Sequence, residues 1–179
     1  MSEHCMPLRQ GLMVWLTGLP SSGKSTLAAR VGEKLRAAGY AVVILDGDEV
    51  RAALRPEPGY DEAGRDAFYE TLARLAALIA AQGLIVLVPA TAHRRAFRDR
   101  ARALVPSFLE VFVDTSLDEC ARRDSKGLYE RARTESTGVM PGVHVEYEAP
   151  IAPELIFRAE DRDASEKLTA YILHQLPRC

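Results

Sequence analysis

Residues 18–25 read Gly-Leu-Pro-Ser-Ser-Gly-Lys-Ser, which is the complete pattern G-x-x-x-x-G-K-[ST]. An apolar run precedes this segment, and apolar residues at helical spacing follow it. Glycines let the backbone curl so that successive N–H groups point at phosphate oxygens, and the helix that starts near Lys24 adds the positive end of its dipole. The pattern in this context predicts a phosphate-binding loop (P-loop) between a strand and a helix. We expect Lys24 to reach the β- and γ-phosphates of a nucleotide and Ser25 to bind Mg²⁺.

Short apolar runs alternate with segments of helical spacing along the rest of the chain. The sequence predicts strands at 12–17, 41–45, 84–88, 109–113 and 155–157, and helices at 24–38, 62–82, 94–104, 116–123 and 163–176. This alternation is typical of a parallel sheet that is covered on both faces. We therefore expect an α/β fold of the P-loop NTPase type, with about five parallel strands, and a single kinase domain over residues 1–179.

The stretch 124–153 interrupts the alternation. It is polar and contains three glycines and three prolines. A loop of this length inside a compact domain is usually a lid or a binding loop. We place the lid approximately at residues 122–150.

Composition excludes several classes of function. The net charge of −2 argues against general nucleic-acid binding, and the apolar runs are shorter than a membrane span requires. Three scattered cysteines and four isolated histidines form no metal-ligand pattern. The N-terminal residues lack the pattern of a secretory signal, so we expect a cytoplasmic protein with no membrane and no nucleic-acid partner.

A GTPase switch is the first alternative to a kinase. Such proteins usually carry N-K-x-D for guanine, and this sequence has no asparagine. Residues 61–64 spell D-x-x-G, but they follow Pro-Gly-Tyr rather than an apolar strand. We interpret Asp61 as the capped start of a helix.

The second predicted strand ends in Asp46-Gly47-Asp48, and Arg51 follows one helical turn later. Carboxylates at this position lie beside the P-loop, at the edge where such sheets bind ligands. One of them can act on Mg²⁺ through water, or orient and deprotonate an attacking hydroxyl. Arg51 could hold an anionic acceptor. The alternative is a strand-end aspartate that only caps a helix.

Three elements together resemble the adenylylsulfate (APS) kinase family. They are the P-loop, the segment 46–51, and residues 124–129, which read Asp-Ser-Lys-Gly-Leu-Tyr; the resemblance runs from about residue 12 to 157. It implies transfer of the γ-phosphate of ATP to the 3′-hydroxyl of APS, a five-stranded parallel P-loop fold with a mobile lid, Mg²⁺ as cofactor, and a homodimer. The partners would be ATP and an anionic, nucleotide-like acceptor.

The resemblance also implies roles for individual residues. Asp48 corresponds to the base or Mg²⁺-linked carboxylate, Arg51 and Arg65 to the arginines that hold the phosphosulfate, and Tyr60 to an aromatic that stacks on the acceptor adenine. The expected catalytic residues are Lys24, Asp46 and Asp48. The expected metal ligands are Ser25 and, through water, Asp48. The expected ATP-binding residues are Gly18, Leu19, Pro20, Ser21, Ser22, Gly23, Lys24, Ser25, Thr26, Arg122 and Arg123. The expected acceptor-binding residues are Asp48, Arg51, Tyr60, Arg65, Phe68, Thr91, Lys126 and Leu128.

The sequence departs from the family pattern mainly around the acceptor. Phe68 stands where the family has an asparagine, Glu70 and Thr71 replace basic residues, and Ala92 replaces a serine that carries phosphate in some members. Met140 stands near the place of an aromatic clamp residue. These changes leave two alternatives to APS: another nucleotide-linked acceptor, such as a CDP derivative, or a regulatory nucleotide-binding protein.

Five arginines lie between residues 94 and 102. Arg94 and Arg95, at the start of the predicted helix, could face an anion. For Arg98, Arg100 and Arg102 we expect a solvated helix face, since charge runs usually face water.

Overall fold

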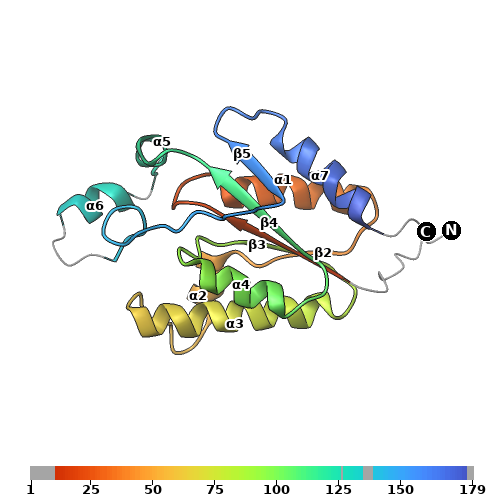
Figure 1. Ribbon diagram of the computed structural model, residues 1–179, viewed down its shortest axis with the longest axis horizontal. Helices are drawn as coiled ribbons and strands as arrows, with labels where there is room; N and C mark the ends of the chain where they lie inside the picture. Colours follow the sequence, from red (N-terminus) through yellow and green to blue (C-terminus); the bar gives the residue numbers. More distant parts are fainter. Residues whose placement is uncertain (1–10, 126, 135–138, 177–179) are drawn as a thin grey trace.

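A computed structural model describes residues 11–125, 127–134 and 139–176. Its centre is a five-stranded sheet in the order β2-β3-β1-β4-β5, and every pairing is parallel (Figure 1). The strands are β1 (Leu12–Thr17), β2 (Val42–Ile44), β3 (Ile85–Pro89), β4 (Phe108–Asp114) and β5 (Leu155–Arg158). The predicted fold class is confirmed.

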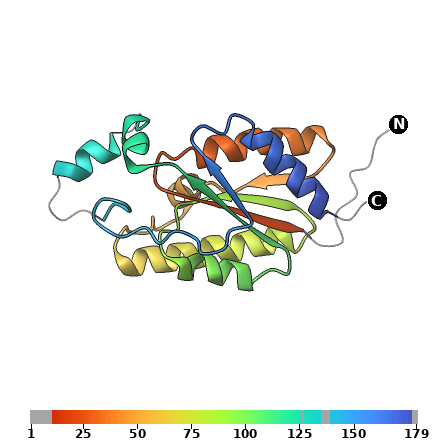
Figure 2. The ribbon, with the colours of Figure 1, turned by 45° about the horizontal axis from the view of Figure 1, so that its top comes forward.

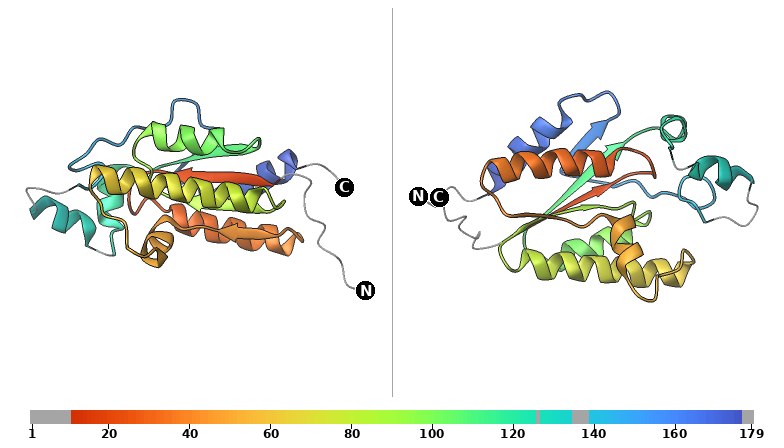
Figure 3. Two further views of the ribbon diagram at one scale, coloured as in Figure 1. Left: turned by 90° about the horizontal axis from the view of Figure 1, so that it is seen from below. Right: turned by 180° about the vertical axis from the view of Figure 1, so that it is seen from behind.

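Helices cover both faces of the sheet. The helices of the described residues are α1 (Lys24–Ala37), α2 (Gly47–Ala53), α3 (Glu62–Ala80), α4 (Arg95–Ala103), α5 (Leu117–Arg122), α6 (Leu128–Thr134) and α7 (Ala164–Gln175). Helices α1 and α7 lie on one face, and α3 and α4 lie on the other (Figure 3). This arrangement lets the strands be apolar on both sides.

The central strand β1 contributes side chains to both layers of the core. Its residues alternate, so that Leu12, Val14 and Leu16 pack under α1 and α7, while Met13 and Trp15 pack under α3 and α4. All six residues of β1 are buried. A continuous apolar run, rather than an alternating one, is the sequence pattern that a strand buried on both faces requires.

The carboxyl ends of the parallel strands share one edge of the sheet. Helices α5 and α6 extend beyond this edge, and the start of β1 and the end of α7 lie toward the opposite edge (Figures 1 and 2). Ligands of open parallel sheets bind at the carboxyl edge. We therefore expect the ligand-binding residues in the loops that follow β1, β2, β3 and β5.

Two short helices lie outside the predicted helix ranges, and one arginine differs from its expectation. The helix α2 starts at the second strand's Asp-Gly-Asp, and α6 lies inside the predicted lid loop. Arg98 is not on a solvated face: it is 1% exposed and pairs with Glu110 of β4. Side chains alternate along β4, so Glu110 and Phe108 lie on the sheet face that α4 covers. Arg98 of α4 therefore faces Glu110 rather than solvent. Among the described residues, no helix is long and apolar enough to cross a membrane.

Candidate functional site

A cleft of about 1100 Å³ lies at the carboxyl edge of the sheet. The P-loop and the turn from β2 into α2 form one part of its wall. The start of α3, the loop after β3 and residues 139–141 form another part, and the β5–α7 loop adds to the P-loop side. Segments from across the sequence thus meet where the fold predicts a ligand site.

Two glycines shape the P-loop for separate reasons. A Cβ on Gly18 would lie 2.5 Å from the carbonyl oxygen of Val113, so the loop passes too close to β4 for any side chain. Gly23, directly before α1, has φ of +102°, a conformation that L side chains rarely adopt. The loop therefore turns sharply into the N-terminus of α1, where helix N–H groups favour an anion.

Lys24 is buried beneath the P-loop. Its Nζ donates hydrogen bonds to the carbonyl oxygens of Gly18 at 3.0 Å and Leu19 at 2.6 Å. Burial lowers the pKa of Lys24 to about 8, against the opposing effect of Cys120, Asp48 and Asp46. The ammonium is still charged at pH 7, and carbonyl oxygens hold it where phosphates would bind.

Ser25 and two aspartates meet beside the loop. Ser25 Oγ donates a hydrogen bond to Asp46 Oδ2 at 2.5 Å. Asp46 also caps α2, because its Oδ1 accepts from the backbone N–H of Asp48 at 2.9 Å. Asp46 is thus the helix cap that the alternative interpretation predicts, and it also contacts the serine expected to bind Mg²⁺.

Arg51 lies between two aromatic rings across the cleft. Its Cζ is 3.8 Å from the ring centroid of Phe68 and 4.5 Å from that of Tyr60. Its NH1 donates to the carbonyl oxygens of Pro58 at 2.9 Å and Gly59 at 2.8 Å. The cation is thus buried among groups that stabilise positive charge.

Arg65 braces the same wall from α3. Its Nε donates to Tyr60 O at 2.6 Å and its NH2 to Val139 O at 2.5 Å. Its NH1 lies 3.4 Å from Nδ1 of His93. Burial and the neighbouring cations Arg65 and Arg94 lower the pKa of His93 to about 4, so its imidazole is neutral at pH 7 and can accept this bond. All three nitrogens of Arg65 have protein partners.

The start of the lid contacts the P-loop directly. Tyr129 Oη donates to Pro20 O at 2.8 Å, and its backbone N–H donates to Asp124 Oδ2 at 2.8 Å. Ser21 Oγ lies 3.5 Å from the other carboxylate oxygen of Asp124. Movement of this part of the lid would therefore disturb the phosphate-binding backbone.

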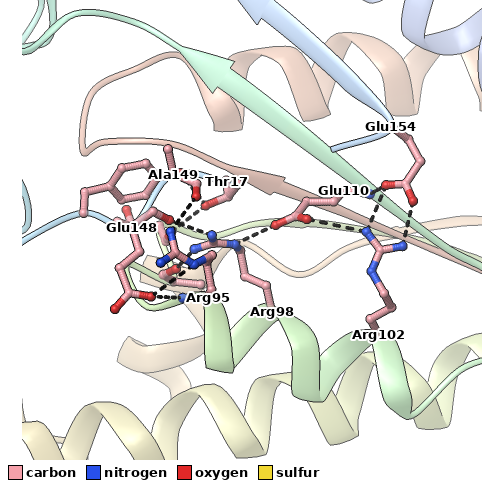
Figure 4. A network of polar contacts seen from close by, with 11 residues as sticks. Thr17, Arg95, Arg98, Arg102, Glu110, Glu148, Ala149 and Glu154 are labelled. Carbon is pink, nitrogen blue, oxygen red and sulfur yellow. Dashed lines mark hydrogen bonds and ion pairs between the residues drawn. The ribbon is translucent and has the colours of Figure 1, made fainter. Parts of the chain in front are cut away.

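A buried charge network supports the far side of the cleft (Figure 4). Arg98 donates through Nε to Glu110 Oε1 at 2.6 Å, through NH1 to Ala92 O at 2.5 Å, and through NH2 to Glu148 O at 2.7 Å. Arg102 extends the network to Glu110 and Glu154. One arginine thereby joins β4, the loop after β3 and the returning arm of the lid.

A second set of contacts fixes that arm to the end of β1. The hydroxyls of Tyr147 and Thr17 lie 2.9 Å apart, and Thr17 Oγ1 donates to Thr91 O at 2.7 Å. The carboxylate of Glu148 accepts from the backbone N–H of Arg95, the first residue of α4 (Figure 4). Sequence reasoning gave none of these contacts.

Most of the expected site residues line the cleft. They are Pro20, Ser21, Ser22, Gly23, Lys24, Ser25, Thr26, Asp46, Asp48, Arg51, Tyr60, Arg65, Phe68, Thr91, Arg123 and Leu128. Gly18 and Leu19 contribute the carbonyl oxygens that bind Lys24 instead. Arg122 is not among the lining residues and pairs with Glu119, which Arg123 also contacts. Lys126 lies outside the described residues.

The cleft also contains residues that sequence reasoning missed. They are Arg30, Glu57, Arg131, Phe157, Arg158, Asp161 and Arg162, among others. Arg158, Asp161 and Arg162 could have been found from the sequence, because they follow the fifth predicted strand and so lie at the ligand-binding edge. Arg30 and Arg131 are placed by tertiary structure, and no local pattern marked them.

Comparison with known proteins agrees with this geometry. The family model described as adenylylsulphate kinase matches residues 10–158. An adenylyl-sulfate kinase of Rippkaea orientalis is 39% identical over 161 residues, which cover 90% of this chain and 89% of that protein. The bifunctional enzyme NodQ of Azospirillum brasilense is 46% identical over 91% of this chain, which spans only 27% of NodQ.

The solved structures give the same result. The Mycobacterium tuberculosis APS kinase CysC, in complex with AMPPNP and APS, is similar with a TM-score of 0.84. It is 37% identical to this chain, and the match covers 91% of this chain and 96% of that one. The structural similarity therefore extends over most of both chains.

Proposed function

Because this chain belongs to the adenylylsulphate kinase family and is thus an ATP-dependent kinase, we propose that it transfers the γ-phosphate of ATP to the 3′-hydroxyl of adenylylsulfate. One observation carries the proposal. A single cleft joins the P-loop, with Lys24 and Ser25, to a wall built from Arg51, Tyr60 and Arg65. The first part suits a nucleotide's phosphates, and the second suits an anionic acceptor with a planar base.

The ATP side rests on the P-loop backbone, residues 18–26, and on Lys24. In the proposal, Lys24 exchanges its carbonyl partners for phosphate oxygens and neutralises the charge that develops during transfer. Arg123 of the lid lines the cleft and faces the same region, with Arg122 beside it in sequence. Both arginines bind Glu119 in this structure, so we propose that they leave it when nucleotide binds.

The donor set beside the P-loop fits Mg²⁺. A hydroxyl and a carboxylate, from Ser25 and Asp46, lie in contact, and Asp48 lines the same cleft. Mg²⁺ prefers oxygen ligands and is usually held by one or two carboxylates, waters and substrate phosphates. In the described part of the chain, no cluster of three His, Cys, Asp or Glu side chains could hold a metal by itself, so ATP would complete the site. When bound, Mg²⁺ supplies charge neutralisation at the phosphates.

We propose that Asp48 is the residue that contacts the acceptor hydroxyl. It follows the cap residue Asp46 in α2 and lines the same cleft as the P-loop and Arg51. From this place its carboxylate would orient the hydroxyl and take its proton as the phosphoryl group arrives in line. Binding of Mg²⁺ by Asp48 through water is part of the same proposal.

The acceptor is proposed to bind along the wall opposite the P-loop. Tyr60 is 54% exposed and presents its ring to the cleft, as stacking on a base requires. Arg51 would contact the phosphosulfate, and Arg65 would add positive charge while bracing Tyr60. Phe68, Thr91 and Leu128 complete the lining, and Lys126 belongs to the proposal on the resemblance alone.

The experiment for this proposal is ADP release from Mg-ATP by the purified protein, with APS and with a panel of CDP- and ADP-linked acceptors. We expect stimulation by APS. Turnover with a CDP-linked acceptor but not with APS would show that the CDP-linked compound is the substrate. Bound ATP without turnover of any acceptor would favour a regulatory protein.

We also propose that the chain forms a homodimer. Leu78 on α3 is 62% exposed and Ile151 is 84% exposed, which is unusual for large apolar side chains that lack a partner. Analytical ultracentrifugation tests this proposal, and a monomer at micromolar concentration would contradict it.

A further inference from the structure

Phe68 lines the acceptor side of the cleft, yet it is only 2% exposed. So little accessible surface leaves its ring almost no area for direct contact with a ligand. Its main polar neighbour is instead Arg51, whose Cζ lies 3.8 Å from the ring centroid. The ring therefore contacts the guanidinium of Arg51 rather than a ligand in the cleft.

The position of Phe68 is fixed by an aromatic cluster on the α3 and α4 side of the sheet. Phe68 packs edge-to-face on Tyr69 at 5.2 Å between centroids, and Tyr69 stacks on Phe97 at 4.7 Å. The hydroxyl of Tyr69 accepts a hydrogen bond from the backbone N–H of Ala92 at 3.0 Å. Phe68 is thus part of the rigid core, and it offers Arg51 a surface that does not move.

The hydrogen bonds of Arg51 complete its orientation. One nitrogen, NH1, is held by the carbonyl oxygens of Pro58 and Gly59. Among the described residues, Nε and NH2 of Arg51 have no hydrogen-bond partner, whereas all three nitrogens of Arg65 have one. Arg51 is therefore the cation of this wall that has donors left for an anion.

We propose that Phe68 is a positioning residue that sets acceptor specificity through Arg51. Its ring, together with Tyr60, holds the guanidinium plane so that the two remaining donors face an anionic group such as a phosphosulfate. A side chain at position 68 that cannot stack would leave Arg51 free to rotate about its bonds to Pro58 and Gly59. This inference rests on the proposed function for the identity of the acceptor, but not for the orientation of Arg51.

The kinetic test compares Phe68→Leu with Phe68→Tyr. A cation–π contact in a desolvated site corresponds to about a five- to thirty-fold change in binding. We expect Phe68→Leu to raise the KM for APS by about that factor, with the KM for ATP unchanged, and Phe68→Tyr to retain the wild-type value. In an Arg51→Lys background, the Phe68→Leu change should have little further effect, because the planar cation is already gone.

Phe97→Leu is the matched control. It removes an aromatic ring of the same buried cluster, which does not contact Arg51. A general loosening of the core would raise the KM for APS in both leucine variants. The proposal is overturned if Phe97→Leu and Phe68→Leu change that KM equally, or if the Arg51→Lys and Phe68→Leu effects simply multiply.

A second measurement needs no acceptor. In ¹⁵N-labelled protein, the Nε–H signal of Arg51, identified by its loss in Arg51→Lys, should be displaced by the ring currents of Tyr60 and Phe68. We expect it to move toward the ordinary arginine position in Phe68→Leu and to stay in Phe97→Leu. An unchanged signal in Phe68→Leu would overturn the proposal. If the wild type binds Mg-ATP but ignores APS, the proposed function fails, and this signal still decides whether Phe68 orients Arg51.

Discussion

Ser25 and Asp46 are joined by a hydrogen bond of 2.5 Å from the serine hydroxyl to the carboxylate. The same carboxylate caps α2 through the backbone N–H of Asp48. One aspartate thereby fixes the distance between the P-loop serine and the helix that carries both Asp48 and Arg51. In the proposed function, metal binding and acceptor binding would both depend on this one side chain.

The first prediction concerns the charge of that aspartate. Asp46→Asn keeps an oxygen that can cap α2 but removes the negative charge beside Ser25. We expect the Mg²⁺ concentration for half-maximal rate to rise about ten- to hundred-fold. Asp99→Asn, on the exposed face of α4, serves as the control. Equal Mg²⁺ dependence of the two variants would remove Asp46 from the metal site.

The second prediction concerns Asp48. Asp48→Asn removes the proposed proton acceptor while preserving size. We expect kcat to fall by about 10²- to 10⁴-fold, the usual contribution of a general base, with the KM for ATP unchanged. Steady-state kinetics at saturating APS, with circular dichroism to verify folding, make the measurement. A variant with wild-type kcat would exclude the role.

The third prediction follows from the pKa of Lys24. Without nucleotide this pKa is about 8, so above pH 8 the free protein must take up a proton before the charged form can bind phosphates. We expect the affinity for ATP to fall by about tenfold per pH unit above pH 8. Calorimetric titration at several pH values should show this slope in the wild type and not in Lys24→Met, which should also lack turnover. The same slope in both proteins would assign it to another group.

The fourth prediction concerns the buried pair Arg98–Glu110, whose side chains are 1% and 10% exposed. Arg98→Met leaves the Glu110 carboxylate with only a long contact to Arg102, so we expect a loss of about 3–5 kcal/mol in the free energy of unfolding. Arg94→Ala breaks the exposed pair with Glu62 and should cost less than about 1 kcal/mol. Urea unfolding compares the two, and similar losses would contradict the account.

Features with a local cause were predictable from the sequence. The P-loop requires glycine at fixed positions, and the side chains of Asp61 and Ser116 cap α3 and α5 as expected. Apolar runs identified all five strands. In β1 and β3, every residue is buried, so these two strands have no polar side. The edge at which ligands bind then followed from the topology.

Features that depend on distant partners were not predictable. Arg98 belongs to a run of arginines, and only its contact with Glu110 of β4 distinguishes it from the solvated Arg94. The contact of Phe68 with Arg51 joins two helices across a turn, so spacing alone gave no indication of it. Helices α2 and α6 have seven residues each, too few for an apolar period to stand out.

The decisive measurement follows the transferred phosphoryl group itself. The protein is incubated with Mg²⁺, ATP labelled in the γ-phosphate, and APS, and the products are separated and their structure determined. We expect the label to appear on the 3′-oxygen of APS in the wild type, and Lys24→Met and Asp48→Asn to abolish this transfer. Label that remains in ATP, or that is released only as inorganic phosphate while APS is unchanged, would contradict the proposed function.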